Sequence, residues 1–150
     1  MTTDLVFVDT NVLLYSRDDR YPIKQQSASR WLVVLAERDA LVVSPQVLGE
    51  FHNAILRGKI ALDAQSARRM SVELQLWSQG ATDLELITQA WSIRAETNFQ
   101  WWDCVILCAA IRAGCRYLLS EDYQHGRTVH GTTIINPFVI GPETIAIEHE

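Results

Sequence analysis

Short apolar runs alternate along this chain with longer segments in which apolar residues recur every three or four positions. The runs 5–8 and 117–119 are apolar without alternation, which is typical of strands covered on both faces. Strands are predicted over residues 5–8, 40–43, 116–120 and 132–135. Helices are predicted from Pro22 onward and over residues 45–57, 63 to about 79, 88 to about 97, and 101–113. This alternation indicates an α/β domain with a mostly parallel sheet between helical layers.

The composition is that of an ordinary globular domain, and we expect residues 1–150 to form a single domain. Apolar residues make up 48% of the chain and charged residues 21%. A chain of 150 residues buries enough surface to fold without a disulfide framework or a structural metal. Cys104, Cys108 and Cys115 lack zinc-ligand spacing and are interpreted as buried thiols in a reducing compartment.

Charge and hydropathy limit the partners that this chain can have. It carries 13 Lys plus Arg against 18 Asp plus Glu, so it has no global basic field for nucleic acid, and such a partner must be held locally. The longest apolar stretch, residues 104–111, is too short to cross a membrane, and the N-terminus does not resemble a secretion signal. We expect no membrane association and a cytoplasmic location.

Two acidic residues stand just beyond predicted strands. Asp9 follows the first strand, and Asp122 follows Ser120 and Glu121 at the end of a later one. Because parallel strands open their carboxyl ends onto one crevice, these two carboxylates are expected to face each other. Each alone is also explained as a turn-forming or capping aspartate, so the pair carries the hypothesis.

Two helical acids extend this set. Glu50 falls at the edge of the apolar face of the helix over residues 45–57, where it is partnered, functional, or extended past the buried stripe to solvent. Asp103 occupies the first turn of a helix that is apolar on every side over residues 104–111. Its carboxylate therefore either caps that helix or lines a cleft.

Four carboxylates brought together would repel each other unless a cation joined them. Oxygen ligands without His or Cys are typical of Mg²⁺, for which Mn²⁺ can substitute. Such an ion binds phosphate oxygens and lowers the pKa of a bound water, so the reaction indicated is phosphodiester hydrolysis. Other phosphate chemistries fit less well, because the chain has no Gly-x-Gly-x-x-Gly or Gly-x-x-x-x-Gly-Lys loop, and Asn11 stands where a phosphatase has a second Asp.

Motifs spread over almost the whole chain resemble those of PIN domains. The matching segments are Val8-Asp9-Thr10-Asn11-Val12-Leu13, Glu50 in a helix after a short strand, Trp102-Asp103, and Leu119-Ser120-Glu121-Asp122. Within that family the chain is similar to the VapC-type ribonuclease toxins, in which the form Ser-Glu-Asp-Tyr-Gln-His-Gly is often met. The resemblance implies a three-layer α/β/α sandwich with a mostly parallel central sheet.

The resemblance also implies an Mg²⁺-dependent endoribonuclease, the toxin component of a type II toxin–antitoxin module. By motif position, the residues implied as catalytic and metal-binding are Asp9, Glu50, Asp103 and Asp122. Asn11 and Ser120 would orient carboxylates or water, and Glu121 is assigned outward by strand alternation. The expected partners are RNA, a small cognate antitoxin and a second copy of the chain.

Several points stay open from the sequence alone. A PIN module that binds RNA or protein without cleaving is the alternative function. The apolar stripe at positions 28, 31, 32 and 35, with the surplus of tryptophan, is an expected contributor to a homodimer interface. His125 and His130 are either substrate contacts or ordinary loop residues. Arg17, Arg20 and Arg127 are likewise either contacts for the substrate phosphate or ordinary solvated loop residues.

Overall fold

The computed structural model describes residues 4–145, whose strands form one five-stranded sheet. The strands are Val6–Val8 (β1), Leu41–Val42 (β2), Tyr117–Leu119 (β3), Thr128–Val129 (β4) and Thr132–Ile135 (β5). Their order in the sheet is β2-β1-β3-β5-β4. All neighbours pair in parallel except β4, which pairs antiparallel with β5 at the edge. The prediction of an α/β fold with a mostly parallel sheet is confirmed.

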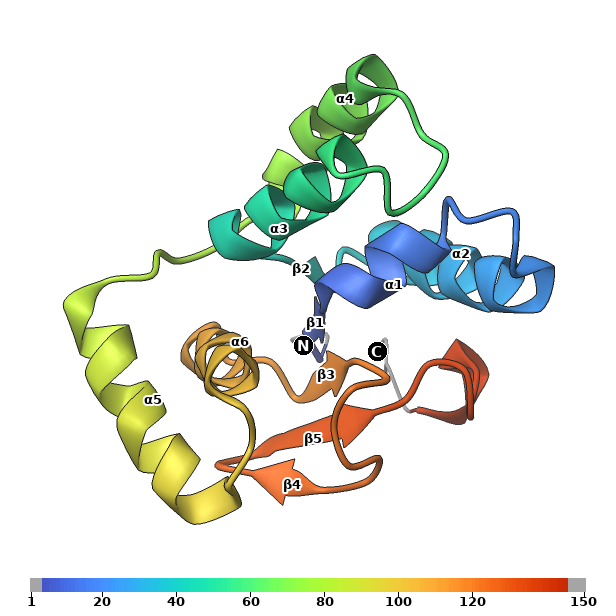
Figure 1. Ribbon diagram of the computed structural model, residues 1–150. Helices are drawn as coiled ribbons and strands as arrows, with labels where there is room; N and C mark the ends of the chain where they lie inside the picture. Colours follow the sequence, from blue (N-terminus) through green and yellow to red (C-terminus); the bar gives the residue numbers. More distant parts are fainter. Residues whose placement is uncertain (1–3, 146–150) are drawn as a thin grey trace.

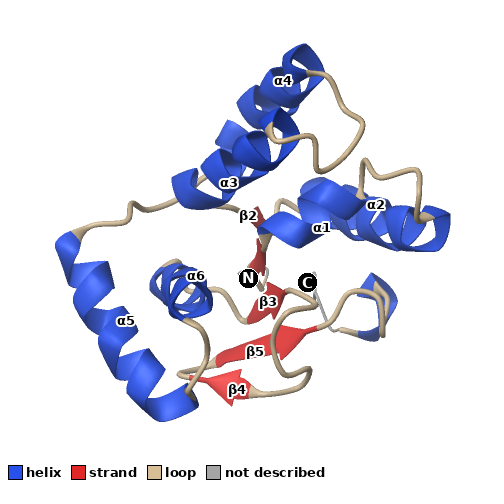
Figure 2. Cartoon of the chain, in the orientation of Figure 1, coloured by secondary structure: helices blue, strands red, loops and turns tan. Residues whose placement is uncertain are grey.

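Helices cover both faces of this sheet. They are Thr10–Tyr15 (α1), Pro22–Glu37 (α2), Pro45–Leu56 (α3), Ala64–Leu74 (α4), Leu84–Thr97 (α5) and Trp101–Arg112 (α6), with 3-10 turns at Gln75–Trp77 and Pro142–Thr144. Figure 1 shows α1 and α2 on one face and α5 and α6 on the other. The pair α3 and α4 projects beyond β2 (Figure 2). The three-layer arrangement is therefore as predicted, with α3 and α4 as an extension.

The core fills the space between the sheet and its two helical layers. Phe7 of β1 and Trp31 of α2 are fully buried. The Trp31 indole N–H donates to the carbonyls of Pro137 and Ile140, each at 3.1 Å, so its polar atom is satisfied. Within its stripe, positions 28 and 35 are also fully buried, and Leu32 is half-buried against the core. The expectation that this stripe contributes to a homodimer interface was wrong, because it packs in the core.

Two helix boundaries differ from the predictions for identifiable reasons. Helix α5 begins at Leu84 because Asp83 Oδ1 accepts a hydrogen bond from the Leu86 N–H at 2.8 Å and caps the helix. Helix α4 ends at Leu74, short of the expected residue 79. The following segment instead joins the edge of the sheet, where the Gln79 N–H donates to the carbonyl of Val43 at 2.9 Å.

Strand β4 was not predicted, because two residues are too few to establish a pattern. It is joined to β5 by a turn at His130 and Gly131, both of which have positive φ, 47° and 85°. A two-residue hairpin with a type I′ turn needs this conformation at both central positions. The turn therefore fixes the edge hairpin more than the strand residues do.

The three cysteines are buried, as predicted from the sequence. All three cysteines are buried free thiols. Burial raises the pKa of Cys115 to about 12 and that of Cys108 to about 11, so both stay protonated at neutral pH. None of the helices within residues 4–145 combines the length and the apolar character that a membrane crossing requires.

Candidate active site

The parallel register of β1 and β3 brings two acidic segments to the same edge of the sheet. Val8 lies opposite Leu119, and the Asp9 N–H donates to the Leu119 carbonyl at 3.1 Å. Asp9 then caps α1, since its Oδ1 accepts a hydrogen bond from the Thr10 N–H at 2.7 Å. Its side chain is held close to the core, and the residue is only 6% exposed.

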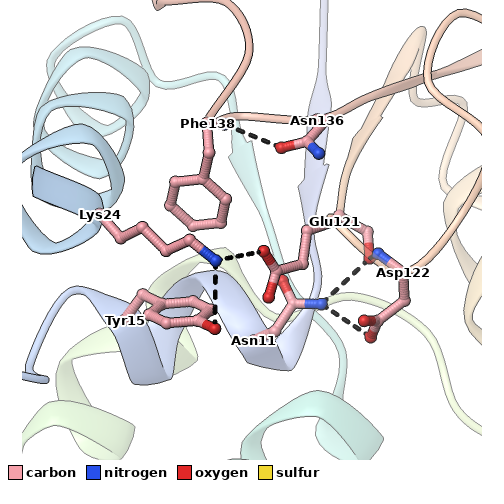
Figure 3. Close-up of polar contacts among 8 residues, drawn as sticks. Asn11, Tyr15, Lys24, Glu121, Asp122, Asn136 and Phe138 are labelled. Carbon is pink, nitrogen blue, oxygen red and sulfur yellow. Dashed lines mark hydrogen bonds and ion pairs between the residues drawn. The ribbon is translucent and has the colours of Figure 1, made fainter. Parts of the chain in front are cut away.

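Ser120 and Asn11 join Asp9 to Asp122. The Ser120 hydroxyl donates to Asp9 Oδ2 at 2.8 Å. Ser120 Oγ also accepts hydrogen bonds from Asn11 Nδ2 and from the Asp122 N–H, each at 3.2 Å. Asn11 Nδ2 also donates to Asp122 Oδ2 at 2.9 Å (Figure 3). The two residues implied as orienting side chains therefore lie between the two aspartates.

Glu50 enters the site from α3, whose buried residues pack on the core. Its Oε2 accepts a hydrogen bond from Thr10 Oγ1 at 2.9 Å, and its Oε1 accepts one from Gln46 Nε2 at 2.9 Å. Glu50 is thus partnered rather than extended to solvent. Because Thr10 contacts both Asp9 and Glu50, it connects the acid of α3 to the acid at the end of β1.

Asp103 lies in the first turn of α6, but it does not cap that helix. The N-cap residue is Gln100, and within the described chain the Asp103 carboxylate accepts no hydrogen bond. The backbone carbonyl of Asp103 accepts a hydrogen bond from the Tyr123 hydroxyl at 2.6 Å. Tyr123 therefore ties the loop that carries Asp122 to the start of α6. The sequence reasoning missed this tyrosine, although it directly follows Asp122.

Burial dominates the electrostatics of Asp9. Burial, and then the negative charges of Asp122 and Glu50, raise the pKa of Asp9 to about 7. The hydrogen bonds that its carboxylate accepts from Ser120 and Thr10 favour the ionised form and act in the opposite direction. Asp9 is therefore partly protonated at neutral pH when no positive charge is present.

Burial and neighbouring negative charges also raise the pKa of the acid on α6. Partial burial, followed by the charges of Asp122 and Glu50, raises the pKa of Asp103 to about 6. Burial, followed by the charge of Asp9, holds the pKa of Tyr123 well above its usual value. The four acids predicted from the sequence are close enough to repel each other, although they come from four separate segments.

The order of these residues along the chain and their placement in the fold match a known family. The family model of the PIN domain matches residues 6–130, which include all four acids. The chain belongs to the PIN domain family. The resemblance noted in the sequence is therefore confirmed.

Solved structures share the fold of this PIN domain. A toxin–antitoxin complex from Klebsiella pneumoniae matches with a TM-score of 0.59 and 14% sequence identity, over 88% of this chain and 97% of that one. VapC20 of Mycobacterium tuberculosis, a toxin that cleaves the sarcin–ricin loop, matches with a TM-score of 0.51 and 18% identity, over 75% of this chain and 86% of that one. No curated protein matches in sequence.

The oxygen donors of this PIN domain suit a hard divalent cation by their chemistry. The four acids supply carboxylates with no His or Cys among them, and the pKa of Asp9 is raised by burial first and by the charges of Asp122 and Glu50 in addition. Asn11 Oδ1 is buried without a hydrogen-bond partner, so the site holds one further unsatisfied oxygen. Across residues 4–145, no three His, Cys, Asp or Glu side chains are set to hold one ion. Glu50 and Asp122 each accept a hydrogen bond from a neighbouring side chain.

The other residues considered for substrate contact are engaged elsewhere. His130 pairs with Glu96 of α5 at 2.9 Å. The Nδ1 atom of His125 accepts a hydrogen bond from the Asn136 N–H at 3.0 Å. Arg127 donates to the side chain of a neighbouring glutamine at 3.0 Å. These contacts agree with the interpretation of all three as loop residues.

Glu121 points away from the four acids, but not into solvent as strand alternation predicted. Strand β3 ends at Leu119, so the alternation does not extend to this residue. The Glu121 carboxylate accepts a hydrogen bond from Lys24 Nζ of α2 at 2.9 Å. Figure 3 shows the Lys24 ammonium nitrogen between the rings of Tyr15 and Phe138, whose centroids lie 4.5 Å and 5.1 Å from it.

Proposed function

We propose that this PIN domain is a metal-dependent endoribonuclease, the toxin component of a type II toxin–antitoxin module. The observation that carries the proposal is the set of four mutually repelling carboxylates at one edge of the sheet, with the pKa of Asp9 raised to about 7. PIN nucleases generally use divalent metal ions. The similarity in fold to two solved structures of toxin systems supports the same class of function.

The four carboxylates would hold Mg²⁺, or Mn²⁺ in its place, and the ion would supply Lewis-acid chemistry to the phosphate and the attacking water. Hydrogen bonds within the chain orient two of these carboxylates in advance, those of Asp9 and Asp122. Ser120 and Thr10 hold the two oxygens of Asp9, and Asn11 holds Asp122. Ligands that are oriented before substrate arrives need less rearrangement during the reaction.

Cleavage of RNA by the purified protein tests this proposal. Cleavage should require Mg²⁺ or Mn²⁺ and stop in excess chelator, because the site has only hard oxygen ligands. Asp9→Asn and Asp122→Asn should each lower the rate by at least two orders of magnitude, roughly 2.7 kcal/mol of barrier. Asp63→Asn is the matched control, since Asp63 also caps a helix but lies at the N-terminus of α4, outside the site.

Two outcomes would contradict the nuclease proposal. Full activity in excess chelator would show that hard-metal chemistry is not used. RNA that is bound tightly but never cut, in the presence of either ion, would favour the non-catalytic PIN module instead.

We further propose that a small antitoxin covers the four carboxylates. An arginine side chain is the simplest inhibitor, because it would bring positive charge to a site where Asp9 and Asp103 have raised pKa values. Co-expression with the product of a neighbouring small reading frame should yield a complex in which RNA cleavage is blocked. A complex that cleaves RNA as fast as the free chain would contradict this inhibitory arrangement.

A further inference from the structure

A cleft of about 230 Å³ adjoins the candidate active site on the side of Asp122. Asn11 and Asp122 line both the acid site and this cleft, so the two are continuous. The remaining walls come from the loop between α1 and α2 and from the loop between α3 and α4. A substrate strand leaving the acids on this side would pass directly over the cleft.

The two loops that form the far wall are fixed to each other through Arg20. Its guanidinium donates to the Lys59 carbonyl at 2.9 Å, and to both oxygens of Asp18 at 2.9 Å and 2.8 Å. Asp18 is nearly buried, and the hydrogen bonds from Arg20 lower its pKa. Arg20 therefore links the two loops of this wall in the absence of a ligand.

The charges that line the cleft are mostly cancelled within the protein. Arg20 neutralises Asp18, and Lys24 neutralises Glu121. In the part of the chain that the structure describes, the ammonium group of Lys59 has no ion-pair or hydrogen-bond partner. The cleft therefore presents one unpaired cation, Lys59, together with the unpaired carboxylate of Asp122 at its border with the acid site, in a chain whose net charge is −5.

An aromatic ring lines the same cleft. Tyr21 is 50% exposed, yet its ring is held in place by its neighbours. The Arg20 guanidinium carbon lies 5.5 Å from its centroid, and the ring of Tyr15 lies 5.9 Å away at 81°. Tyr15 is packed in turn on Phe138, at 5.1 Å. An exposed aromatic ring that shares a cleft with a free cation suits single-stranded nucleic acid, whose bases stack on aromatic rings and whose phosphates attract positive charge.

We propose that this cleft is a nucleotide subsite. It takes one nucleotide of a single-stranded RNA next to the bond that is cut, with the base against Tyr21 and a phosphate near Lys59. This subsite rests on the ribonuclease function proposed above. It also explains how an acidic protein can hold RNA locally, since Lys59 offsets the repulsion between phosphate and the carboxylates.

RNA binding in chelator tests the subsite without any cleavage. The probe is a fluorescently labelled single strand of about 12 nucleotides and mixed sequence, followed by anisotropy. Tyr21→Ala should weaken binding about tenfold through lost stacking, and Tyr21→Phe should bind as wild type does. Lys59→Gln should reduce the slope of log Kd against log salt concentration by about 0.7, the value for one phosphate contact on a single strand.

Two matched variants control for loss of an exposed aromatic or basic residue elsewhere. Trp91→Ala removes a ring that is 61% exposed on α5, and Arg68→Gln removes an exposed cation on α4. Neither residue lines the cleft, so both variants should bind RNA as wild type does. With Mn²⁺, the cleft variants should show a raised KM for RNA but wild-type hydrolysis of bis(p-nitrophenyl) phosphate, which has no nucleotide to occupy the subsite.

The outcomes separate this proposal from the proposed function. Wild-type protein that binds no RNA, or cleft variants with the affinity, salt slope and KM of wild type, would overturn the subsite even if RNA is cleaved. A protein that shows the expected binding differences but cleaves nothing with either ion would retain the subsite and refute the nuclease.

Discussion

Asp9 should make the metal-free protein less stable as the pH rises. Its pKa is raised from 3.8 to about 7 in the folded chain by burial and by neighbouring carboxylates. Between these values the folded chain keeps a proton that the unfolded chain has released, so the free energy of unfolding falls with increasing pH. The stability that depends on protonated Asp9 is fully present below about pH 4 and is lost as the pH rises through about 7.

The interval from 3.8 to about 7 corresponds to about 4 kcal/mol, at about 1.4 kcal/mol per pH unit. About 2 to 3 kcal/mol of this falls between pH 5 and 8. Asp9 is only 6% exposed, so little of the effect is screened by solvent. Asp9→Asn removes the titrating group while keeping a residue that caps helices about equally well. The variant should therefore gain about 2 to 3 kcal/mol relative to wild type over that pH range.

Urea unfolding in chelator at several pH values between 5 and 8 measures this difference, with the fluorescence of buried Trp31 as one reporter. Asp63→Asn should follow the wild-type curve, because Asp63 is an exposed helix cap whose pKa is lowered instead of raised. Stability curves for wild type and Asp9→Asn that stay parallel across the range would refute the reasoning. They would mean that Asp9 is ionised without penalty and that the site is not crowded with negative charge.

Three further predictions concern the metal, Ser120 and assembly. Mg²⁺ should raise the melting temperature and release protons near pH 6.5, as measured by thermal melts and by calorimetry in buffers of different ionisation enthalpy. Asp122→Asn should weaken both effects, and an equal response in wild type and variant would remove Asp122 from the metal site. Ser120→Ala should destabilise the protein by about 1 to 2 kcal/mol and shift the Asp9 titration to higher pH, because the carboxylate loses a donor that favours its charge; an unchanged titration would contradict that role. We expect a homodimer by light scattering at micromolar concentration, and a monomer there would contradict it.

The sheet could be predicted because its central strands are apolar on both faces, as Phe7 and Leu118 show by their complete burial. Two helix boundaries could not be predicted from the pattern of apolar residues. The N-terminus of α5 depends on Asp83, whose carboxylate also pairs with Arg112 of α6 at 2.8 Å. The end of α4 depends on Gln79 joining the edge of the sheet. For α4 the deciding partner, Val43, lies in another part of the sheet, which periodicity within one segment does not reveal. The cap of α5 is local, and periodicity alone does not register a capping residue.

The contacts of the candidate active site also fall into those that the sequence predicted and those that only the fold shows. The approach of Asp9 and Asp122 follows from parallel strands that end at one edge, so strand prediction was sufficient. The contact of Glu50 with Thr10 depends on how α3 packs against α1, and the sequence indicated only that Glu50 lies at the edge of an apolar face. The ion pair of Glu121 with Lys24 joins residues far apart in the chain, and only the folded structure shows it.

Helix α1 helps to hold three of the four acids, Asp9, Glu50 and Asp122, without positive charge. It has six residues, too few to be stable alone, so it depends on the burial of Val12 and Leu13 in the core. The opposite side offers three consecutive polar residues to the site: Asp9 as the cap, Thr10 on Glu50, and Asn11 on Ser120 and Asp122. The apolar half of this short motif thus supports the orientation of the polar half. Core packing of Val12 and Leu13 consequently opposes the repulsion among the carboxylates. The short motif from Asp9 to Leu13 supplies both the apolar residues that stabilise the helix and the polar residues that hold the acids.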